Sequence, residues 1–103
     1  MNNLTDIAGS NAVVNLGLIA QADGFPLGAA ARWVQAVATG VGTARVGGVN
    51  VSAIVGLPVI ANGGSQFLPV QSNGENPAPY NLNALNAYIP VGCTLSVGYE
   101  PFG

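Results

Sequence analysis

The chain contains very little charge. Its 103 residues include two arginines, four acidic residues, no histidine and no lysine, so 6% of the chain is charged, against about a quarter in a typical soluble domain. Two arginines cannot form the basic patch that nucleic-acid binding requires, which excludes that function. Charge normally keeps soluble proteins apart, so a chain that is half apolar and almost uncharged is typical of an assembly component rather than an enzyme.

The chain also lacks the usual residues of catalytic and metal sites. Serine and cysteine nucleophiles usually need a histidine base, and there is none. A single cysteine, Cys93, cannot form an internal disulfide or hold a structural zinc ion; we expect it in the core as a small apolar residue. The four carboxylates, Asp6, Asp23, Glu75 and Glu100, lie near the termini or in expected loops. We therefore predict no catalytic residues, no metal and no cofactor.

No apolar run is long enough to span a membrane, and residues 1–12 lack the basic start of a signal peptide. The length fits one domain. We predict that residues 1–12 form an extended N-terminal arm and that residues 13–103 form the domain. Leu4 and Ile7 are the large apolar residues of this arm, and we expect them to seat on a neighbouring subunit.

Glycine and proline are abundant, with 15 and seven residues, and they separate short runs rich in valine, isoleucine, threonine and aromatics. This texture predicts an all-β fold, a single antiparallel β-sandwich or jelly-roll-like domain. No window shows a sustained helical stripe. The clearest strand is 93–99, where Cys93, Leu95, Val97 and Tyr99 alternate with small or polar residues. With the alternating run before it, we interpret residues 84–99 as a β-hairpin that turns at residues 90–92.

The rest of the chain predicts further strands and two irregular stretches. Strand candidates are residues 11–19, 32–39, 43–47, 49–55 and 66–70. We interpret 32–39 and 43–47 as a tight strand pair joined by glycines 40 and 42. Pro58 marks an edge strand or a bend. Residues 23–29 are irregular, and the proline-bearing stretch 71–80 is expected to protrude as a loop.

Large aromatic and charged side chains are few enough to assign one by one. We expect Trp33 and two or three other rings to fill the core, whereas a line of exposed rings would bind sugars. Arg32 and Arg45 lie on neighbouring predicted strands. They either pair with Glu75 or Glu100 across a subunit boundary or are solvated surface charges.

The order of turns and strands between residues 32 and 99 resembles that of a known group of proteins. A tryptophan-bearing strand precedes the segment GTARVGG at 42–48, and a closing strand follows at 92–97. Between them come Val51-Ser52, Gly56-Leu57-Pro58, the turn at 62–64, Phe67-Leu68 and Tyr80-Asn81-Leu82. This pattern resembles small β-sandwich structural proteins of tailed-bacteriophage virions. The first 28 residues lie outside the pattern.

The resemblance implies a virion protein made in the host bacterial cytoplasm and placed on the capsid surface. The expected role is that of a capsid decoration (cement) protein, often trimeric, and no catalytic residue comes with the pattern. The implied partners are the major capsid protein and other copies of the chain, with no membrane and no nucleic acid. The expected contacts are Leu4, Ile7, Arg32, Arg45, Glu75 and Tyr80. The alternatives are a tail, neck or fibre-base module and a non-catalytic carbohydrate-binding module.

Overall fold

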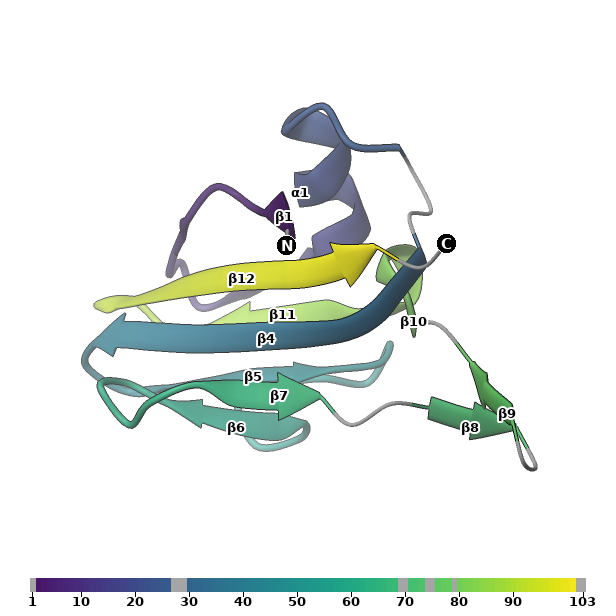
Figure 1. Ribbon diagram of the computed structural model, residues 1–103. Helices are drawn as coiled ribbons and strands as arrows, with labels where there is room; N and C mark the ends of the chain where they lie inside the picture. The colour runs from purple at the N-terminus through teal and green to yellow at the C-terminus, as the bar shows by residue number, and fades with distance from the viewer. Residues whose placement is uncertain (1, 27–29, 69–70, 74–75, 79, 102–103) are drawn as a thin grey trace.

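The computed structural model describes residues 2–26, 30–68, 71–73, 76–78 and 80–101. Two antiparallel sheets pack face to face as a β-sandwich, with one short helix beside them (Figure 1). The all-β sandwich expected from the turn spacing is therefore confirmed.

The larger sheet has six strands and is built around the long strands β4 (Ala30–Gly40) and β12 (Cys93–Pro101). They pair with each other over almost their full length, with a register shift after Glu100. The short strands β1 (Asn2–Asn3) and β2 (Ile7–Ala8) flank β12, and β7 (Gln66–Leu68) and β10 (Tyr80–Asn81) flank β4.

The smaller sheet has four strands in the order β3 (Ala12–Asn15), β11 (Asn86–Ile89), β5 (Thr43–Gly47) and β6 (Leu57–Ile60). Pro58 lies in β6, at the edge of this sheet, as its missing N–H requires. Within the stretch 71–80, the structure describes β8 (Gln71–Asn73) and β9 (Asn76–Ala78), which pair only with each other among the described strands. Figure 1 shows this small hairpin standing away from the sandwich, in the place of the expected protruding loop.

The core lies between the two sheets. Strand β12 turns Cys93, Leu95, Val97 and Tyr99 inward, as their alternation predicts, and all four are buried. Trp33 is not a core residue: it is half-buried in β4, and the inward positions of that strand belong to Ala31, Val34, Ala36 and Ala38. Of the aromatic rings that the structure describes, Tyr99 is the one buried in the core, and Phe25 packs against it edge to face with ring centroids 5.7 Å apart.

Both predicted strand pairs are wrong in their pairing, although the strands themselves are present. Strand β11 is in the smaller sheet and β12 is in the larger one, so residues 84–99 are not a hairpin. Likewise β4 and β5 lie in different sheets. Residues 40–42 and 90–92 are therefore arches that carry the chain across the core. In an arch, two successive strands face each other across the core, and this arrangement buries one alternating face of each strand just as a hairpin does.

The first dozen residues are not a free arm. Asn2–Asn3 and Ile7–Ala8 pair with β12, and the Leu4 N–H donates to the Val97 carbonyl at 2.9 Å. Leu4 is 5% exposed and Ile7 is 8% exposed, and both belong to the core cluster. The expectation that these two side chains seat on a neighbouring subunit is wrong, because the strand β12 offers this segment unpaired backbone groups and an apolar surface within the same chain.

Two further segments differ from the predicted strands. In 11–19, only Ala12–Asn15 is a strand, after which Leu16–Ala22 form helix α1. Asn15 accepts the Leu18 N–H at 3.0 Å and so caps this helix, which packs against the 3₁₀ turn Leu82–Ala84. Residues 49–55 form no strand. They belong to a loop between β5 and β6 that is anchored by the buried Val51.

Candidate functional site

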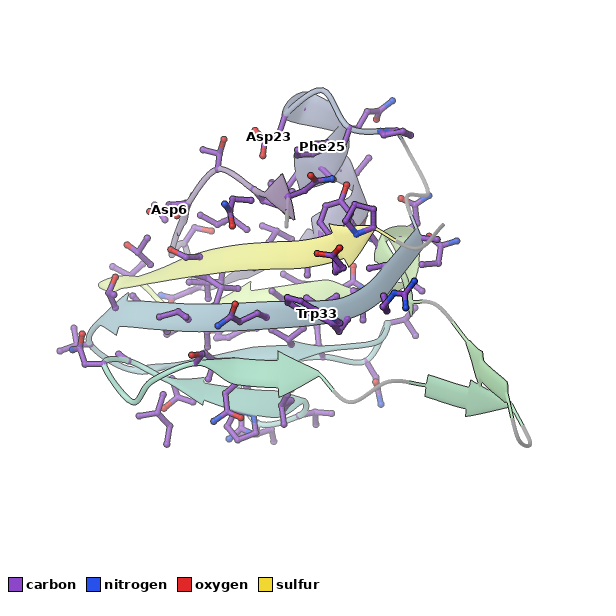
Figure 2. The ribbon with its side chains drawn as sticks, in the orientation of Figure 1. Asp6, Asp23, Phe25 and Trp33 are labelled. Atoms are coloured by element: carbon purple, nitrogen blue, oxygen red, sulfur yellow. The ribbon has the colours of Figure 1, made fainter. Side chains whose placement is uncertain are left out.

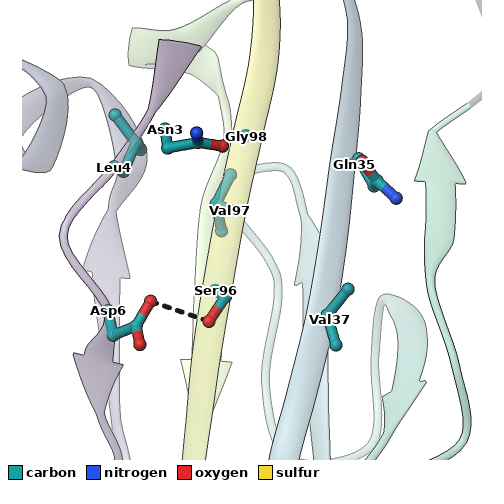
Figure 3. Close-up of a pocket in the computed structure, with 8 residues that line it drawn as sticks. All are labelled: Asn3, Leu4, Asp6, Gln35, Val37, Ser96, Val97 and Gly98. Atoms are coloured by element: carbon teal, nitrogen blue, oxygen red, sulfur yellow. Dashed lines mark hydrogen bonds between the residues drawn. The ribbon is translucent and has the colours of Figure 1, made fainter. Parts of the chain in front are cut away.

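The outer face of the larger sheet carries a shallow polar depression. Strand β12 turns Thr94, Ser96 and Gly98 outward, opposite to its core residues. Gly98 has no side chain and lies between Asn3 and Gln35 on the neighbouring strands, which leaves a hollow of about 200 Å³. Figure 3 shows the eight residues that line it: Asn3, Leu4, Asp6, Gln35, Val37, Ser96, Val97 and Gly98. We call this hollow the sheet depression.

The sheet depression offers hydrogen bonds but little chemistry. The Ser96 hydroxyl donates to the Asp6 carboxylate at 2.7 Å, so this pair is already engaged. The other polar groups are the side-chain amides of Asn3 and Gln35. Within the described residues, no three histidine, cysteine, aspartate or glutamate side chains come together to hold a metal ion. The site can bind a polar group but supplies no second titratable group beside Asp6.

A second hollow, the helix-side depression, lies between the N-terminal segment and helix α1. It has a volume of about 300 Å³ and is lined by Thr5, Asp6, Ile7, Ala8, Ile19, Ala22 and Asp23. Most of this lining is aliphatic, and the two carboxylates come from its two walls. Figure 2 labels Asp6 on the N-terminal segment and Asp23 beside α1.

Asp23 joins the end of helix α1 to the N-terminal segment, the two sides of this depression, through hydrogen bonds with Thr5. Its carboxylate accepts the Thr5 hydroxyl at 2.6 Å and the Thr5 N–H at 2.7 Å. These two hydrogen bonds, the hydroxyl first, lower the pKa of the Asp23 carboxyl from its ordinary value, because they favour the charged form. The depression is therefore pre-formed within the single chain.

The third feature is an uncharged surface at the end of the sandwich where the two arches meet. It is formed by residues 9–11, 39–42, 60–64 and 90–92, which we call the arch end; none of these residues is charged. The Val41 N–H donates to the Gly92 carbonyl at 3.0 Å, which fixes one arch to the other. Val41 is 69% exposed and Val91 is 64% exposed. These two side chains, here called the apolar tip, project from turns that face solvent.

Two asparagines lock the arches from either side. Asn11 and Asn62 have left-handed backbones, with φ of 57° and 59°. The Asn11 side-chain oxygen accepts the Val91 N–H at 2.9 Å, and the Asn62 side-chain amide donates to the Gly40 carbonyl at 2.9 Å. Asparagine is one of the few residues that tolerates this backbone conformation, so the sequence Asn62-Gly63-Gly64 did indicate a turn. The sequence did not indicate that this turn would contact the Gly40 carbonyl at the end of β4.

The predicted contact residues do not come together in one place. Arg32 and Arg45 lie in different sheets, so the expectation that they occupy neighbouring strands is wrong. Arg45 holds the loop that follows its own strand, because its guanidinium donates to the carbonyls of Gly56 at 3.0 Å and Ala53 at 3.3 Å. Tyr80 pairs through its backbone with Ala31, and Glu75 lies outside the described residues.

Cys93 is buried in the core, as expected for a small apolar residue. Burial raises the pKa of its thiol, which keeps the sulfur protonated and unreactive. Among the described residues, no helix is long and apolar enough to cross a membrane.

Comparisons with protein-family models, with curated proteins and with solved structures give no match to this chain.

Proposed function

We propose that this protein is a non-catalytic structural component of a virion, a capsid decoration protein that binds between major capsid subunits and stabilises the shell. The observation that carries the proposal is the surface. Among the residues that the structure describes, eight large aliphatic side chains are more than 40% exposed, while the whole chain contains six charged residues. They are Val13, Leu18, Val41, Val49, Ile54, Val55, Ile60 and Val91. Such a surface suits repeated contact with other protein, because few charges have to lose water.

The outer face of the smaller sheet supports the same function. One row of residues crosses all four strands, from Val13 through Tyr88 and Arg45 to Pro58. Three of these four side chains are apolar or aromatic, and the arginine is already engaged with the loop beside it. A shell offers many identical sites, so weak contacts made by each copy would add up without tight binding at any one of them.

Mass spectrometry of purified virions, with the copy number of this chain measured against the major capsid protein, tests the proposal. Hundreds of copies are expected for a decoration protein. A dozen copies or fewer would indicate a component of the tail, neck or fibre base instead. Absence from the particle would contradict a virion role altogether.

A carbohydrate-binding module is the second candidate, and the sheet depression is the observation that favours it. Asn3, Asp6 and Gln35 supply hydrogen-bonding groups, and Trp33 lies two residues before Gln35 on the same outer face of β4. However, the described rings do not form one platform. Tyr99 is in the core with Phe25 against it, and Tyr88 belongs to the other sheet. Titration with neutral oligosaccharides, followed by Trp33 fluorescence, separates the two candidates: saturable quenching favours sugar binding.

A further inference from the structure

We propose that the helix-side depression binds a primary aliphatic amine, and that its occupant in an assembly is the lysine side chain of a partner protein. The apolar stem of the amine would lie against the aliphatic lining, and its ammonium group would lie beside the two carboxylates. The inference rests on the proposed function only in taking the amine from a partner protein.

The depression has room for one side chain and is formed before any ligand arrives. Its volume of about 300 Å³ lies at the small end of ligand sites, which span about 300–1,000 Å³. Its aliphatic lining consists of Ile7, Ala8, Ile19 and Ala22. Thr5 donates two hydrogen bonds to Asp23 and so holds the two sides together in the free protein. Binding therefore avoids the entropy cost of ordering the site.

The two carboxylates decide which end of the ligand has to be charged. Asp6 accepts the Ser96 hydroxyl at 2.7 Å through one of its oxygens. Its other oxygen receives no hydrogen bond within the part of the chain that the structure describes. An occupant that is apolar throughout would remove water from Asp6 and Asp23 and give nothing in return. An ammonium group replaces the lost water with a favourable charge interaction, so an amphipathic cation fits both parts of the lining.

The same lining disfavours other classes of ligand. Two carboxylates repel an anion. None of the described residues that line the depression is aromatic, so a sugar ring has no face on which to stack. A metal ion would need further ligands, and the described residues bring no group of three histidine, cysteine, aspartate or glutamate side chains together.

The hydrogen bonds already present favour an ammonium group over a guanidinium group. A bidentate arginine pair uses both oxygens of one carboxylate in a fixed planar geometry. Both oxygens of Asp23 already accept from Thr5, and one oxygen of Asp6 accepts from Ser96. An ammonium group is a compact charge that can use a single oxygen, and the unbranched lysine stem lies readily along an apolar surface.

The amine has to come from another kind of molecule. The chain contains no lysine, so a second copy brings no amine side chain to the depression. Neither arginine lines it, and Arg45 in the smaller sheet is already bound to the carbonyls of Ala53 and Gly56. A partner protein that presents a lysine supplies the missing charge.

Titration of the full chain with small amines, followed by NMR, tests this inference. The probes are N-acetyl-lysine amide, N-acetyl-norleucine amide, which has the same stem without the amine, and n-pentylamine. At low salt, the lysine probe should shift the backbone amides of Thr5, Ile7 and Ala22 in a saturable way. The norleucine probe should bind about threefold more weakly or less tightly still, because it lacks the charge interaction. Raising sodium chloride to about 0.5 M should weaken only the two amines.

Three variants locate the binding. Asp6→Asn removes one charge and keeps an oxygen for the Ser96 hydroxyl, so the lysine probe should bind about threefold more weakly. Ala22→Leu fills the depression from an exposed position of α1 and should abolish the binding of every probe. Glu100→Gln is the matched control, because it makes the same change in net charge at a residue that does not line the depression. Circular dichroism checks that each variant is folded.

Equal binding of the lysine and norleucine probes would overturn the inference, since the carboxylates would then play no part. Binding of the lysine probe that persists in Ala22→Leu would also overturn it, by placing the site elsewhere. If n-pentylamine binds and the blocked lysine does not, the assignment to a partner's side chain is wrong. The titration needs no virion, so a failure of the capsid proposal would show in the copy number and would leave this result unchanged.

Discussion

At the scale of single residues, alternation is the strongest information in this sequence. It placed Cys93, Leu95, Val97 and Tyr99 on one face of a strand, and the structure buries all four. Alternation tells only which face is inward, because a side chain does not record which sheet its strand joins. The same limit explains Trp33. Its size suggested the core, but it stands at an outward position of β4, where Val34 and Ala36 point inward.

Leu95→Asp should prevent folding. Leu95 is fully buried between the sheets, and an unpaired carboxylate there costs several kcal/mol, against a total stability of about 5–15 kcal/mol for a small domain. Thermal denaturation followed by circular dichroism should show no cooperative transition. Thr39→Asp, which adds the same group at an exposed position of β4, should melt close to the wild type. A soluble Leu95→Asp variant that melts like the parent would mean that the strand register is wrong.

Asn62→Ala should destabilise the arch end. The left-handed backbone of residue 62 costs about 1–2 kcal/mol for a residue such as alanine, and the lost bond to the Gly40 carbonyl adds about 0.5–1.5 kcal/mol. Asn62→Gly relieves the backbone cost and loses only the hydrogen bond, so it should be the milder variant. Urea denaturation of both variants measures the difference. Equal losses would show that the backbone conformation contributes nothing.

At the scale of elements, the sequence predicts where the strands lie better than it predicts which strands pair with each other. Residues 32–39 and 43–47 are strands, as their composition predicts, but the glycines between them build an arch rather than a hairpin. A short glycine turn serves both connections, and only the packing of the whole core selects one. The helix Leu16–Ala22 was missed for a related reason, since seven residues are too few to establish a 3.6-residue period.

The N-terminal segment should be essential to stability, contrary to its expected role as an arm. Leu4→Ala and Ile7→Ala each remove a buried side chain from the core cluster, and each should cost about 2–5 kcal/mol in the free energy of unfolding. Asn3→Ala, at an exposed neighbouring position, is the control and should change little. Unchanged urea midpoints for Leu4→Ala and Ile7→Ala would instead support the original prediction that residues 1–12 are an arm outside the core.

The attachment of this segment to α1 should weaken in acid. The folded pKa of Asp23 lies below its unfolded value, so its hydrogen bonds to Thr5 stabilise the fold above the unfolded pKa and are lost as the pH falls through the folded one. Hydrogen exchange at the Thr5 amide should therefore accelerate, relative to an unstructured peptide, at a pH below the ordinary aspartate range of about 4. In Asp23→Asn this pH dependence should disappear; its persistence would assign the effect to another group.

At the scale of the whole molecule, the proposed role rests on the exposed apolar side chains. The sequence supplied the total of charged and apolar residues, and from it the class of assembly component was proposed. It could not locate the arch end, because residues 9–11, 39–42, 60–64 and 90–92 are brought together only by the crossing of both arches. Similarly, the helix-side depression exists only because the N-terminal segment folds back onto the domain.

Self-association should depend on the hydrophobic effect rather than on charge. Because the arch end has no charged residue, the association constant should change less than about twofold between 0.05 and 0.5 M sodium chloride, while sulfate should strengthen association. Sedimentation equilibrium in the two salts measures both effects. A steep loss of association in sodium chloride would indicate an interface built on the six charged side chains instead.

The position of β12 also bears on how the protein is made. This strand occupies the middle of the larger sheet, yet the ribosome adds it after every strand with which it pairs, β1, β2 and β4. Until residues 93–101 leave the exit tunnel, the apolar faces of those earlier strands have nothing to pack against. Folding should therefore wait until β12 has been synthesised, and a chain terminated before this strand should be left as a substrate for chaperones and proteases.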